Sequence, residues 1–386
     1  MEKLKVFEGF AGIGAVSKAI ERLGIPHELV GFSEIDKYAI KSFCAVHGVD
    51  ESLNWGDVCK IDETKLPDMD LYTFGSPCQD FSVAGKQKGA VWTCNDCTDE
   101  QGNPTEYNPL DVHWSKRDVC PICGSKNINK SRSSLVVEAL RIIRHKKPKY
   151  LLMENVKNLV GKQFKPSFDK IIAELKEYGY NTYWDVLNAK QYGVPQNRER
   201  VFVVGIRKDI DTGLYKFPKG FDNGIRLKDM LEEHIADKYY LSQDVQNRLK
   251  FNDKQTSNKD NNKKYLSKAI DKIIEKNDGK IPEAWDIYSK NPINTGIAKT
   301  LSCDCGHTGT AGSTAVTDGF KIRKLTPREC WRLMGFNDTD FDNAKSVGMS
   351  DTQLYKQAGN SIVVNCLEYM FKELFITSVK SLHNIG

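Results

Sequence analysis

Short apolar runs alternate with amphipathic segments over the first 206 residues of the chain. Each run is rich in Val, Ile, Leu, Phe and Tyr, which is typical of strands buried in a sheet. Two intervening segments, 15–23 and 135–144, have helical periodicity. Strands joined by helices in this order predict an α/β domain with a mostly parallel sheet covered by helices. The expected strands are 4–7, 29–33, 71–74, 150–154, 182–187 and 201–206.

The pattern changes between residues 209 and 320, where apolar residues are scattered and the run 251–265 is almost wholly Asn, Lys, Asp, Gln and Ser. This composition indicates a smaller, irregular domain with a solvated loop. Helical periodicity returns at 327–334, and the apolar segment 361–376 is long enough to pack as a helix. We therefore expect a large domain over 1–208, a smaller one over 209–320, and a C-terminal segment over 321–386.

Composition narrows the class of protein. The chain has 386 residues, 40% of them hydrophobic and 28% charged, which excludes disorder, collagen and coiled coil. Lys and Arg number 56 against 51 Asp and Glu, a net charge of +5 that permits a nucleic-acid partner without requiring one. No apolar run approaches the ~18 residues of a membrane span, and none follows the N-terminus as in a signal peptide. We expect a cytoplasmic protein with no membrane contact.

A glycine-rich turn follows the first expected strand. Gly9, Gly12 and Gly14 stand where that strand gives way to a helix, and such a turn lets a ligand approach bare backbone N–H groups. A turn that simply needs positive φ is the structural alternative. Glu34 follows the second strand, where an acid can accept both hydroxyls of a ribose. Asp57 is suited to an adenine amino group or, as the alternative, to capping a turn.

Three further strand ends carry reactive side chains. The strand 71–74 runs into Pro77 and Cys78, the strand 150–154 ends at Glu154, and Arg198 and Arg200 precede the strand 201–206. Ligands of open α/β sheets bind outside the carboxyl ends of the strands. A thiol, a carboxyl and two guanidiniums are therefore expected to meet in one cleft.

The sequence resembles the DNA (cytosine-5)-methyltransferases in an ordered series of motifs along the whole chain. The resemblance implies a Rossmann-like methyltransferase domain that uses S-adenosylmethionine, a target-recognition domain over 209–320, and a C-terminal segment that returns to complete the catalytic domain. The matching segments are Phe-Ala-Gly-Ile-Gly at 10–14, Glu34, Gly56-Asp57, Ser-Pro-Cys-Gln at 76–79, Glu-Asn-Val at 154–156, Gln196 to Arg200, Arg-Lys-Leu-Thr-Pro-Arg-Glu at 323–329 and Gln-Ala-Gly-Asn-Ser at 357–361.

The family's chemistry explains the reactive residues. Because C5 of cytosine is a poor nucleophile, a thiolate, here Cys78, first adds to C6 and makes C5 an enamine carbon. Glu154 is expected to supply a proton at N3, which requires it to be neutral or hydrogen-bonded near neutral pH. Arg198 and Arg200 are expected to hold the base carbonyl and the nucleotide. The target base must be flipped out of the duplex to be reached.

The resemblance also implies which residues contact the cofactor. Asn360 and Ser361, expected to begin the last helix, would close over it, with a helix cap as the alternative. Phe10 would lie against the sulfonium or the adenine. Ile35 departs from the aromatic residue that many relatives carry after the acid. The full expected set is Phe10, Ala11, Gly12, Gly14, Glu34, Asp57, Pro77, Asn360 and Ser361.

Four of the eleven cysteines form two CxxC pairs, Cys94 with Cys97 and Cys120 with Cys123. Two such pairs at ribbon-like spacing predict one structural zinc ion, with a redox pair as the alternative. They lie in a segment, 91–130, that relatives keep short, and we expect this zinc-ribbon-like insert to lengthen the loop that closes on DNA. His113 could replace a thiolate but is expected to be a surface residue. Cys303, Cys305 and His307 suggest metal only weakly.

We therefore expect a monomeric enzyme that methylates cytosine C5 within a specific sequence of double-stranded DNA, with a cognate restriction endonuclease as a possible partner. Three other functions remain open. A tRNA methyltransferase of the same fold would carry a shorter middle domain, and an inactive zinc-bearing DNA-binding protein would lack Cys78 or Glu154. A nicotinamide-dependent oxidoreductase needs the GxGxxG fingerprint, which is absent because Ser17 stands at its last glycine.

Overall fold

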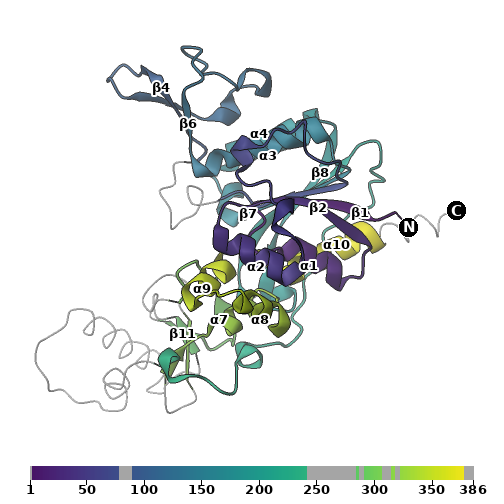
Figure 1. Ribbon diagram of the computed structural model, residues 1–386, viewed down its shortest axis with the longest axis vertical. Helices are drawn as coiled ribbons and strands as arrows, with labels where there is room; N and C mark the ends of the chain where they lie inside the picture. The colour runs from purple at the N-terminus through teal and green to yellow at the C-terminus, as the bar shows by residue number, and fades with distance from the viewer. Residues whose placement is uncertain are drawn as a thin grey trace, which may run out of the picture.

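The computed structural model describes residues 2–77, 89–240, 284–286, 291–306, 314–317 and 322–377. Its centre is a six-stranded sheet with helices on both faces (Figure 1). All six strands expected from the apolar runs are present. They are β1 (Leu4–Gly9), β2 (His27–Ser33), β3 (Leu71–Phe74), β7 (Tyr150–Val156), β8 (Tyr180–Asn188) and β10 (Glu199–Arg207).

The strand order is β2-β1-β3-β7-β10-β8. The four strands from β2 to β7 are parallel, whereas β10 pairs antiparallel with both β7 and β8. The chain leaves β1 toward β2 and returns to β3 on its other side, so the strand order reverses between β1 and β3. Such a reversal creates a crevice at the carboxyl ends of the strands, where ligands of this architecture bind.

Two apolar cores cover the two faces of the sheet because side chains alternate along each strand. Val6, Leu152 and Phe202 point into the core shared with α1 (Ala15–Arg22) and α10 (Val364–Phe371). Their neighbours Phe7, Met153 and Val203 point into the opposite core, shared with α3 (Val136–Lys146) and α4 (Lys165–Glu177). The helices predicted at 15–23 and 135–144 are thus confirmed to within two residues.

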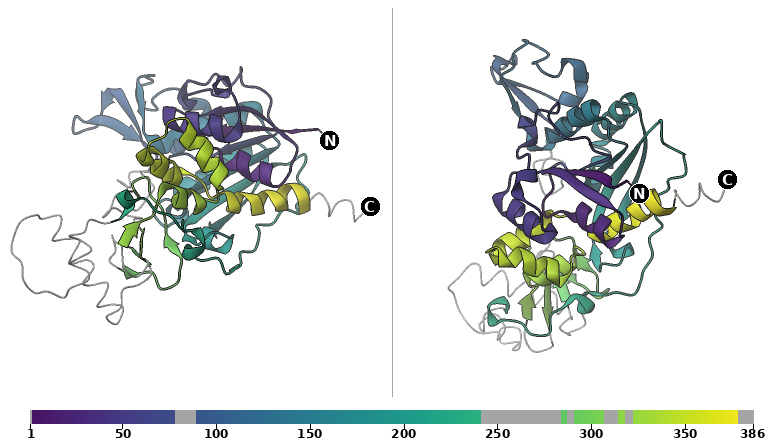
Figure 2. Two further views of the ribbon diagram at one scale, coloured as in Figure 1. Left: turned by 60° about the horizontal axis from the view of Figure 1, so that its bottom comes forward. Right: turned by 45° about the vertical axis from the view of Figure 1, so that its right-hand side comes forward.

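The C-terminal segment packs back on the first half of the chain, as expected. Helix α10 lies against α1, and α8 (Asp338–Ser346) lies against α2 (Lys37–His47), as Figure 2 also shows. Helices α7 (Pro327–Arg332) and α9 (Asp351–Asn360) pack on each other. One expectation is corrected: residues 357–360 end α9, and the last helix begins only at Val364 and continues as a π-helical turn, Lys372–Thr377.

The described part of the middle segment contributes three strands to a small sheet in the order β12-β11-β14-β15, and the C-terminal segment contributes β15. This sheet lies at the end of the molecule near α7 and α8 (Figure 1). A two-residue strand, β13 (Ala298–Lys299), pairs instead with β9 (Gln196–Asn197) of the large domain. The polar run 251–265 lies outside the described residues. The other strands are β11 (Ala284–Asp286), β12 (Asn291–Pro292), β14 (Thr314–Thr317) and β15 (Ile322–Lys324).

The insert forms a separate three-stranded sheet at the opposite end of the molecule (Figures 1 and 2). Its order is β5-β4-β6, with antiparallel pairing, and its strands are β4 (Trp92–Thr98), β5 (Pro104–Tyr107) and β6 (Ile128–Lys130). Among the described helices, none combines the length and apolar character needed to cross a membrane.

Candidate active site

The glycine turn after β1 holds several residues in the left-handed region of backbone space. Phe10 has φ +55°, Gly12 φ +57° and Gly14 φ +78°, and Gly14 is the N-cap residue of α1. A Cβ atom on Gly14 would lie 2.0 Å from Nε2 of His47, so no larger residue fits there. Phe10 adopts a conformation that is unfavourable for a bulky residue, which is typical of functional sites.

The Glu34 carboxylate fixes this turn against the end of β2. Its Oε2 accepts a hydrogen bond from the Gly12 N–H at 2.9 Å, and its Oε1 accepts from the N–H groups of Ile35 and Asp36. The Ile35 side chain is 74% exposed and therefore does not pack over the turn. Glu34 lies where an acid that binds a ribose is expected, although the turn already uses both of its oxygens.

Asn54 connects Glu34 to the Gly56-Asp57 segment. Its Oδ1 accepts from the N–H groups of both Glu34 and Gly56. Asp57 caps a short 3₁₀ turn, Val58–Lys60, through a hydrogen bond from the Cys59 N–H to its Oδ1. The capping role weighed from the sequence is therefore present, and Asn54 is a residue that the motif comparison did not single out.

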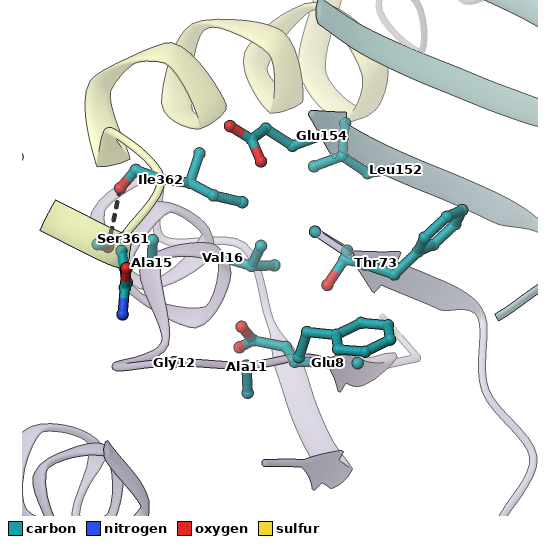
Figure 3. A pocket seen from close by; sticks show the side chains of 15 residues that line it. Glu8, Ala11, Gly12, Ala15, Val16, Thr73, Leu152, Glu154, Ser361 and Ile362 are labelled. Atoms are coloured by element: carbon teal, nitrogen blue, oxygen red, sulfur yellow. Dashed lines mark hydrogen bonds between the residues drawn. The ribbon is translucent and has the colours of Figure 1, made fainter. Parts of the chain in front are cut away.

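A pocket opens at the reversal point between β1 and β3 (Figure 3). It brings together Phe10, Ala11 and Gly12 from the turn, Glu154 from the end of β7, and Asn360 and Ser361 from the end of α9, as the sequence predicted. Gly14, Glu34, Asp57 and Pro77 are not among its lining residues. The full lining is Glu8, Gly9, Phe10, Ala11, Gly12, Ala15, Val16, Thr73, Phe74, Gly75, Leu152, Glu154, Asn360, Ser361 and Ile362.

Glu8 is a pocket residue that sequence reasoning missed. It is 2% exposed, and its Oε1 accepts hydrogen bonds from the backbone N–H and the hydroxyl of Ser17. Burial raises the pKa of this carboxyl to about 7, although the Ser17 hydrogen bonds oppose the shift. The sequence could have indicated Glu8, because it is an acid within the apolar run Val-Phe-Glu-Gly at a strand end. Burying a carboxyl costs free energy, so an acid in such a run is a candidate functional residue.

Glu154 and Arg200 form an ion pair at the edge of the pocket. The distance from Arg200 Nε to Glu154 Oε1 is 3.0 Å, and the two side chains are 17% and 13% exposed. Glu154 stands opposite Phe202 in the antiparallel β7–β10 pair, so Arg200, two residues earlier, is its diagonal neighbour on the same face. The predicted meeting of a carboxyl and a guanidinium is confirmed for this pair.

The segment that leads to Cys78 is held against β7. The Asn155 Nδ2 lies 3.3 Å from both the carbonyl and the hydroxyl oxygen of Ser76. A Cβ atom on Gly75 would lie 3.3 Å from Glu154 Oε2, so the backbone passes close to that carboxyl. Pro77 is half-buried. Cys78 itself lies outside the described residues.

Arg198 does not occupy the expected position at the base. Its side chain is buried, and its terminal nitrogens donate to the carbonyls of Leu301, Gly359 and Ser361 at 2.9, 3.0 and 2.9 Å. These contacts join the large domain, the middle segment and the end of α9. The expectation that Arg198 holds the base is therefore corrected: the described contacts make it a link between three chain segments.

The four insert cysteines converge as predicted. Their sulfur atoms all lie within 4.8 Å of one another, with Cys94 to Cys123 at 3.5 Å and Cys97 to Cys120 at 3.7 Å. Four thiolates about 2.3 Å from one zinc ion stand about 3.8 Å apart, whereas bonded sulfurs stand about 2.05 Å apart. Burial opposes ionisation of Cys120, but hydrogen bonds from the backbone N–H groups of Cys123 and Ile122 lower the pKa of its thiol to about 7. The donor set therefore fits zinc.

The insert docks on helices α3 and α4. The Arg117 guanidinium binds both oxygens of Glu174 on α4, at 2.9 and 2.6 Å, with both side chains 8% exposed. On α3, the Lys130 ammonium lies 2.6 Å from the Glu138 carboxylate. These contacts place the insert over α3 and α4. They do not test whether the insert takes part in closure on DNA, which stays a prediction.

The other candidate metal ligands are not part of the cluster of four cysteines. His113 bonds to Ser115 and Glu177 at the surface and is no part of the thiol group. Cys305 is buried, with its Sγ 3.9 Å from the Tyr355 carbonyl, and His307 lies outside the described residues. Within the described residues, the four thiols of the insert are the only group found that could hold a metal ion.

The sheet and the pocket at its reversal point define a Rossmann-like fold with a ligand site at the carboxyl ends of its strands. The model of the C-5 cytosine-specific DNA methylase family matches residues 4–96 and 122–376, and the chain belongs to this family. It is an enzyme that transfers a methyl group from S-adenosylmethionine to C5 of cytosine in DNA. The internal residues that the family model does not match, 97–121, lie within the insert, which agrees with the expectation that the insert is a departure from the family pattern.

Named relatives span nearly the whole chain. Identity is 32% to the orphan methyltransferase M.SPRI of Bacillus phage SPR, over 98% of this chain and 99% of the relative. It is 34% to the type II methyltransferase M2.ScrFI of Lactococcus lactis subsp. cremoris, over 96% and 99%. It is 32% to the type II methyltransferase M.HhaI of Haemophilus parahaemolyticus, over 95% and 93%.

Solved structures share the fold. The Schizosaccharomyces pombe Dnmt2 methyltransferase aligns with a TM-score of 0.63 and 19% identity, over 98% of this chain and 99% of that one. A putative DNA modification methyltransferase encoded within an Escherichia coli prophage aligns with a TM-score of 0.58 and 18% identity, over 97% and 99%. At these identities the likeness concerns the fold alone.

Proposed function

We propose that the chain methylates one cytosine within a specific sequence of double-stranded DNA, with Cys78 as the nucleophile and Glu154 and Arg200 at the base. The observation that carries this proposal is the Glu154–Arg200 pair. It stands on the rim of a pocket whose other walls are the glycine turn and the end of α9. A carboxyl and a guanidinium beside the segment that leads to Cys78 support a role for both groups at the base.

The proposed reaction proceeds by covalent addition. The Cys78 thiolate attacks C6 of the flipped cytosine, and electron density moves to N3, where Glu154 donates a proton or a hydrogen bond. C5 then carries enamine character and attacks the methyl carbon of S-adenosylmethionine, whose methyl–sulfur bond would break so that S-adenosylhomocysteine leaves. A base, such as water, removes the C5 proton, and the thiolate leaves. Arg200 orients the Glu154 carboxyl and offers further N–H donors to the base.

The pocket residues fit S-adenosylmethionine, which supplies an electrophilic methyl group on its sulfonium. Ala11 and Gly12 offer backbone without bulky side chains at the end of β1, and Phe10 offers an aromatic ring. Glu34 and Asp57 lie beside this turn, and Asn360 and Ser361 close the other wall. Glu34 would bind the ribose hydroxyls with the lone pairs that its hydrogen bonds to the turn leave over. Gly14 and Pro77 would shape the turn and the nucleophile loop rather than contact the cofactor.

The insert is proposed to hold one structural zinc ion through Cys94, Cys97, Cys120 and Cys123. The sulfur separations support this assignment. Zinc would stabilise a small sheet that contributes little apolar core of its own.

The middle segment, 209–320, is proposed to read the DNA sequence, and the chain is proposed to act as a monomer in the cytoplasm of a bacterial or phage-infected cell. Relatives include type II methyltransferases, so a cognate endonuclease could share the recognition sequence. Bisulfite sequencing of DNA from cells that express the protein tests the proposal directly. We expect one recurring sequence to be protected in wild-type cells and none in cells that express Cys78→Ser. A wild type with no protected cytosine would contradict the proposal.

A further inference from the structure

Arg198 connects two parts of the chain that lie more than 50 residues apart in sequence and have different proposed tasks. One terminal nitrogen donates to the Leu301 carbonyl of the middle segment, at 2.9 Å. The other donates to the Gly359 and Ser361 carbonyls at the end of α9, at 3.0 and 2.9 Å. The residue is 4% exposed, so these charge-assisted hydrogen bonds are shielded from water and strong.

The middle segment also binds the two residues that precede Arg198. Ala298–Lys299 pairs as a parallel strand with Gln196–Asn197. The Leu301 N–H donates to Gln196 Oε1 at 3.1 Å, and the Thr300 hydroxyl donates to the Asn197 carbonyl at 2.6 Å. These contacts bind residues 298–301 to residues 196–198, so we expect the two segments to move as one unit.

The end of α9 has no room to move independently of this segment. A Cβ atom on Gly359 would lie only 2.2 Å from the Ser302 carbonyl oxygen, so the two backbones are in direct contact. Asn360 and Ser361, the next residues, line the pocket. A displacement at 301–302 must therefore shift the pocket wall or break the Arg198 hydrogen bonds.

We propose that Arg198 is a positioning residue that couples DNA recognition by the middle segment to S-adenosylmethionine binding. This inference rests on the proposed function, because it takes residues 209–320 as the DNA reader and the pocket as the cofactor site. The planar guanidinium fixes three carbonyls relative to one another. Separating them would leave a buried cation short of partners, which is costly. DNA binding that holds residue 301 in place thus also holds Ser361 in place.

Thermodynamic linkage makes the proposal measurable. If target DNA tightens cofactor binding by some factor, the cofactor must tighten DNA binding by the same factor, and coupling between sites typically amounts to about 5- to 150-fold. The probe is S-adenosylhomocysteine, which binds without turnover. Its affinity is measured by calorimetry with and without a saturating duplex that carries the target found by bisulfite sequencing.

Arg198→Met keeps the apolar stem but removes the donors. Arg207→Met makes the same change at the far end of β10, the strand that Arg198 directly precedes, where the side chain binds Asp209 and the Lys147 carbonyl. We expect the coupling factor to fall close to 1 in Arg198→Met and to stay at the wild-type value in Arg207→Met. Arg198→Lys can reach some of the carbonyls and should retain part of the coupling.

Thr300→Val removes the neighbouring hydrogen bond to Asn197 without touching the pocket. It should reduce coupling while leaving the affinity for S-adenosylhomocysteine alone unchanged, and it decides the matter if Arg198→Met does not fold. Full coupling in a folded Arg198→Met protein or in Thr300→Val would overturn the inference. So would a wild type that binds both ligands and methylates its target but shows no coupling, whereas failure of the proposed function would appear as a wild type without methylation.

Discussion

The Arg200 Nε atom lies 3.0 Å from the Glu154 carboxylate, and both side chains are mostly buried at the pocket rim. The pairing of β10 with β7 sets this distance, because Arg200 stands two residues before the partner of Glu154 and on the same face of the sheet. The Glu154 carboxyl, which is proposed to act at N3 of the base, is thus oriented by the strand register before any base enters.

Glu154→Gln should slow methylation while preserving the shape of the site. An amide cannot deliver a proton to N3, so we expect a loss of about 10²- to 10⁴-fold in the single-turnover rate, as is typical of general acid catalysis. Glu199→Gln is the matched control, because Glu199 begins β10 but pairs with Lys157 at the surface. A Glu154→Gln enzyme as fast as the control would remove Glu154 from the mechanism.

Glu34→Ala should act on cofactor affinity. The change removes the proposed ribose contact and also the hydrogen bond that fixes the Gly12 N–H, and a charge-assisted bond of this kind corresponds to about 10- to 100-fold in affinity. Titration with S-adenosylmethionine in a calorimeter measures the effect. Glu28→Ala, at an exposed position on β2, the strand that Glu34 directly follows, should bind like wild type. Equal affinities for both variants would show that Glu34 does not serve the cofactor.

Glu8 should make the stability of the protein depend on pH. Its pKa is about 7 in the folded protein against an ordinary value of 4.5, so the folded state binds the proton more tightly than the unfolded state. The stabilisation that Glu8 contributes to the folded state is therefore fully present below pH 4.5 and is lost as pH rises through 7. The loss amounts to about 3 kcal/mol in total. Urea unfolding of wild type and Glu8→Gln between pH 5 and 8 (about the window of the shift) tests this. We expect the variant to lack this loss, and parallel curves would contradict the assignment.

Cys120→Ser should release zinc. Metal analysis of the purified wild type should give about one zinc per chain, and the variant should give none. Loss of the ion should loosen the Arg117–Glu174 contact on α4 and lower the melting temperature. We expect DNA binding to weaken more than S-adenosylmethionine binding, because the pocket residues lie on the other side of the sheet.

The matched control for that experiment is Cys303→Ser, which changes an exposed thiol outside the cluster. It should retain zinc. A zinc-free wild type prepared under reducing conditions, or a Cys120→Ser protein with unchanged zinc, would show that the four thiols do not hold a metal ion.

The six strands of the main sheet were predictable because each contains a short run rich in apolar and β-branched residues between turn residues. The inner strands β3 and β10 are largely buried, whereas the edge strand β8 is partly exposed. The convergence of Glu154 with Arg200 also followed from the sequence, since both residues stand at the same edge of the sheet. Four thiols in two CxxC pairs likewise left few geometries open. In each case a short sequence pattern was enough for the prediction: an apolar run, a residue at a strand end, or the spacing of two cysteines.

The role of Arg198 could not be predicted in the same way. Its partners are backbone carbonyls of residues 301, 359 and 361, and any sequence supplies carbonyls, so no residue pattern identifies them. The start of α9 was missed for another reason. The helix has few apolar residues, and its sign is a cap, Ser350, whose hydroxyl accepts from the Gln353 N–H.

The most direct test of the central claim is a covalent trap. A duplex that carries 5-fluorocytosine at the target position blocks the final loss of the C5 substituent, so the enzyme should remain bound to DNA after methyl transfer. We expect an adduct that survives denaturing electrophoresis, is joined to the peptide containing Cys78 by mass spectrometry, and is absent from Cys78→Ser. An active wild type that forms no adduct, or an adduct joined at another residue, would contradict the account.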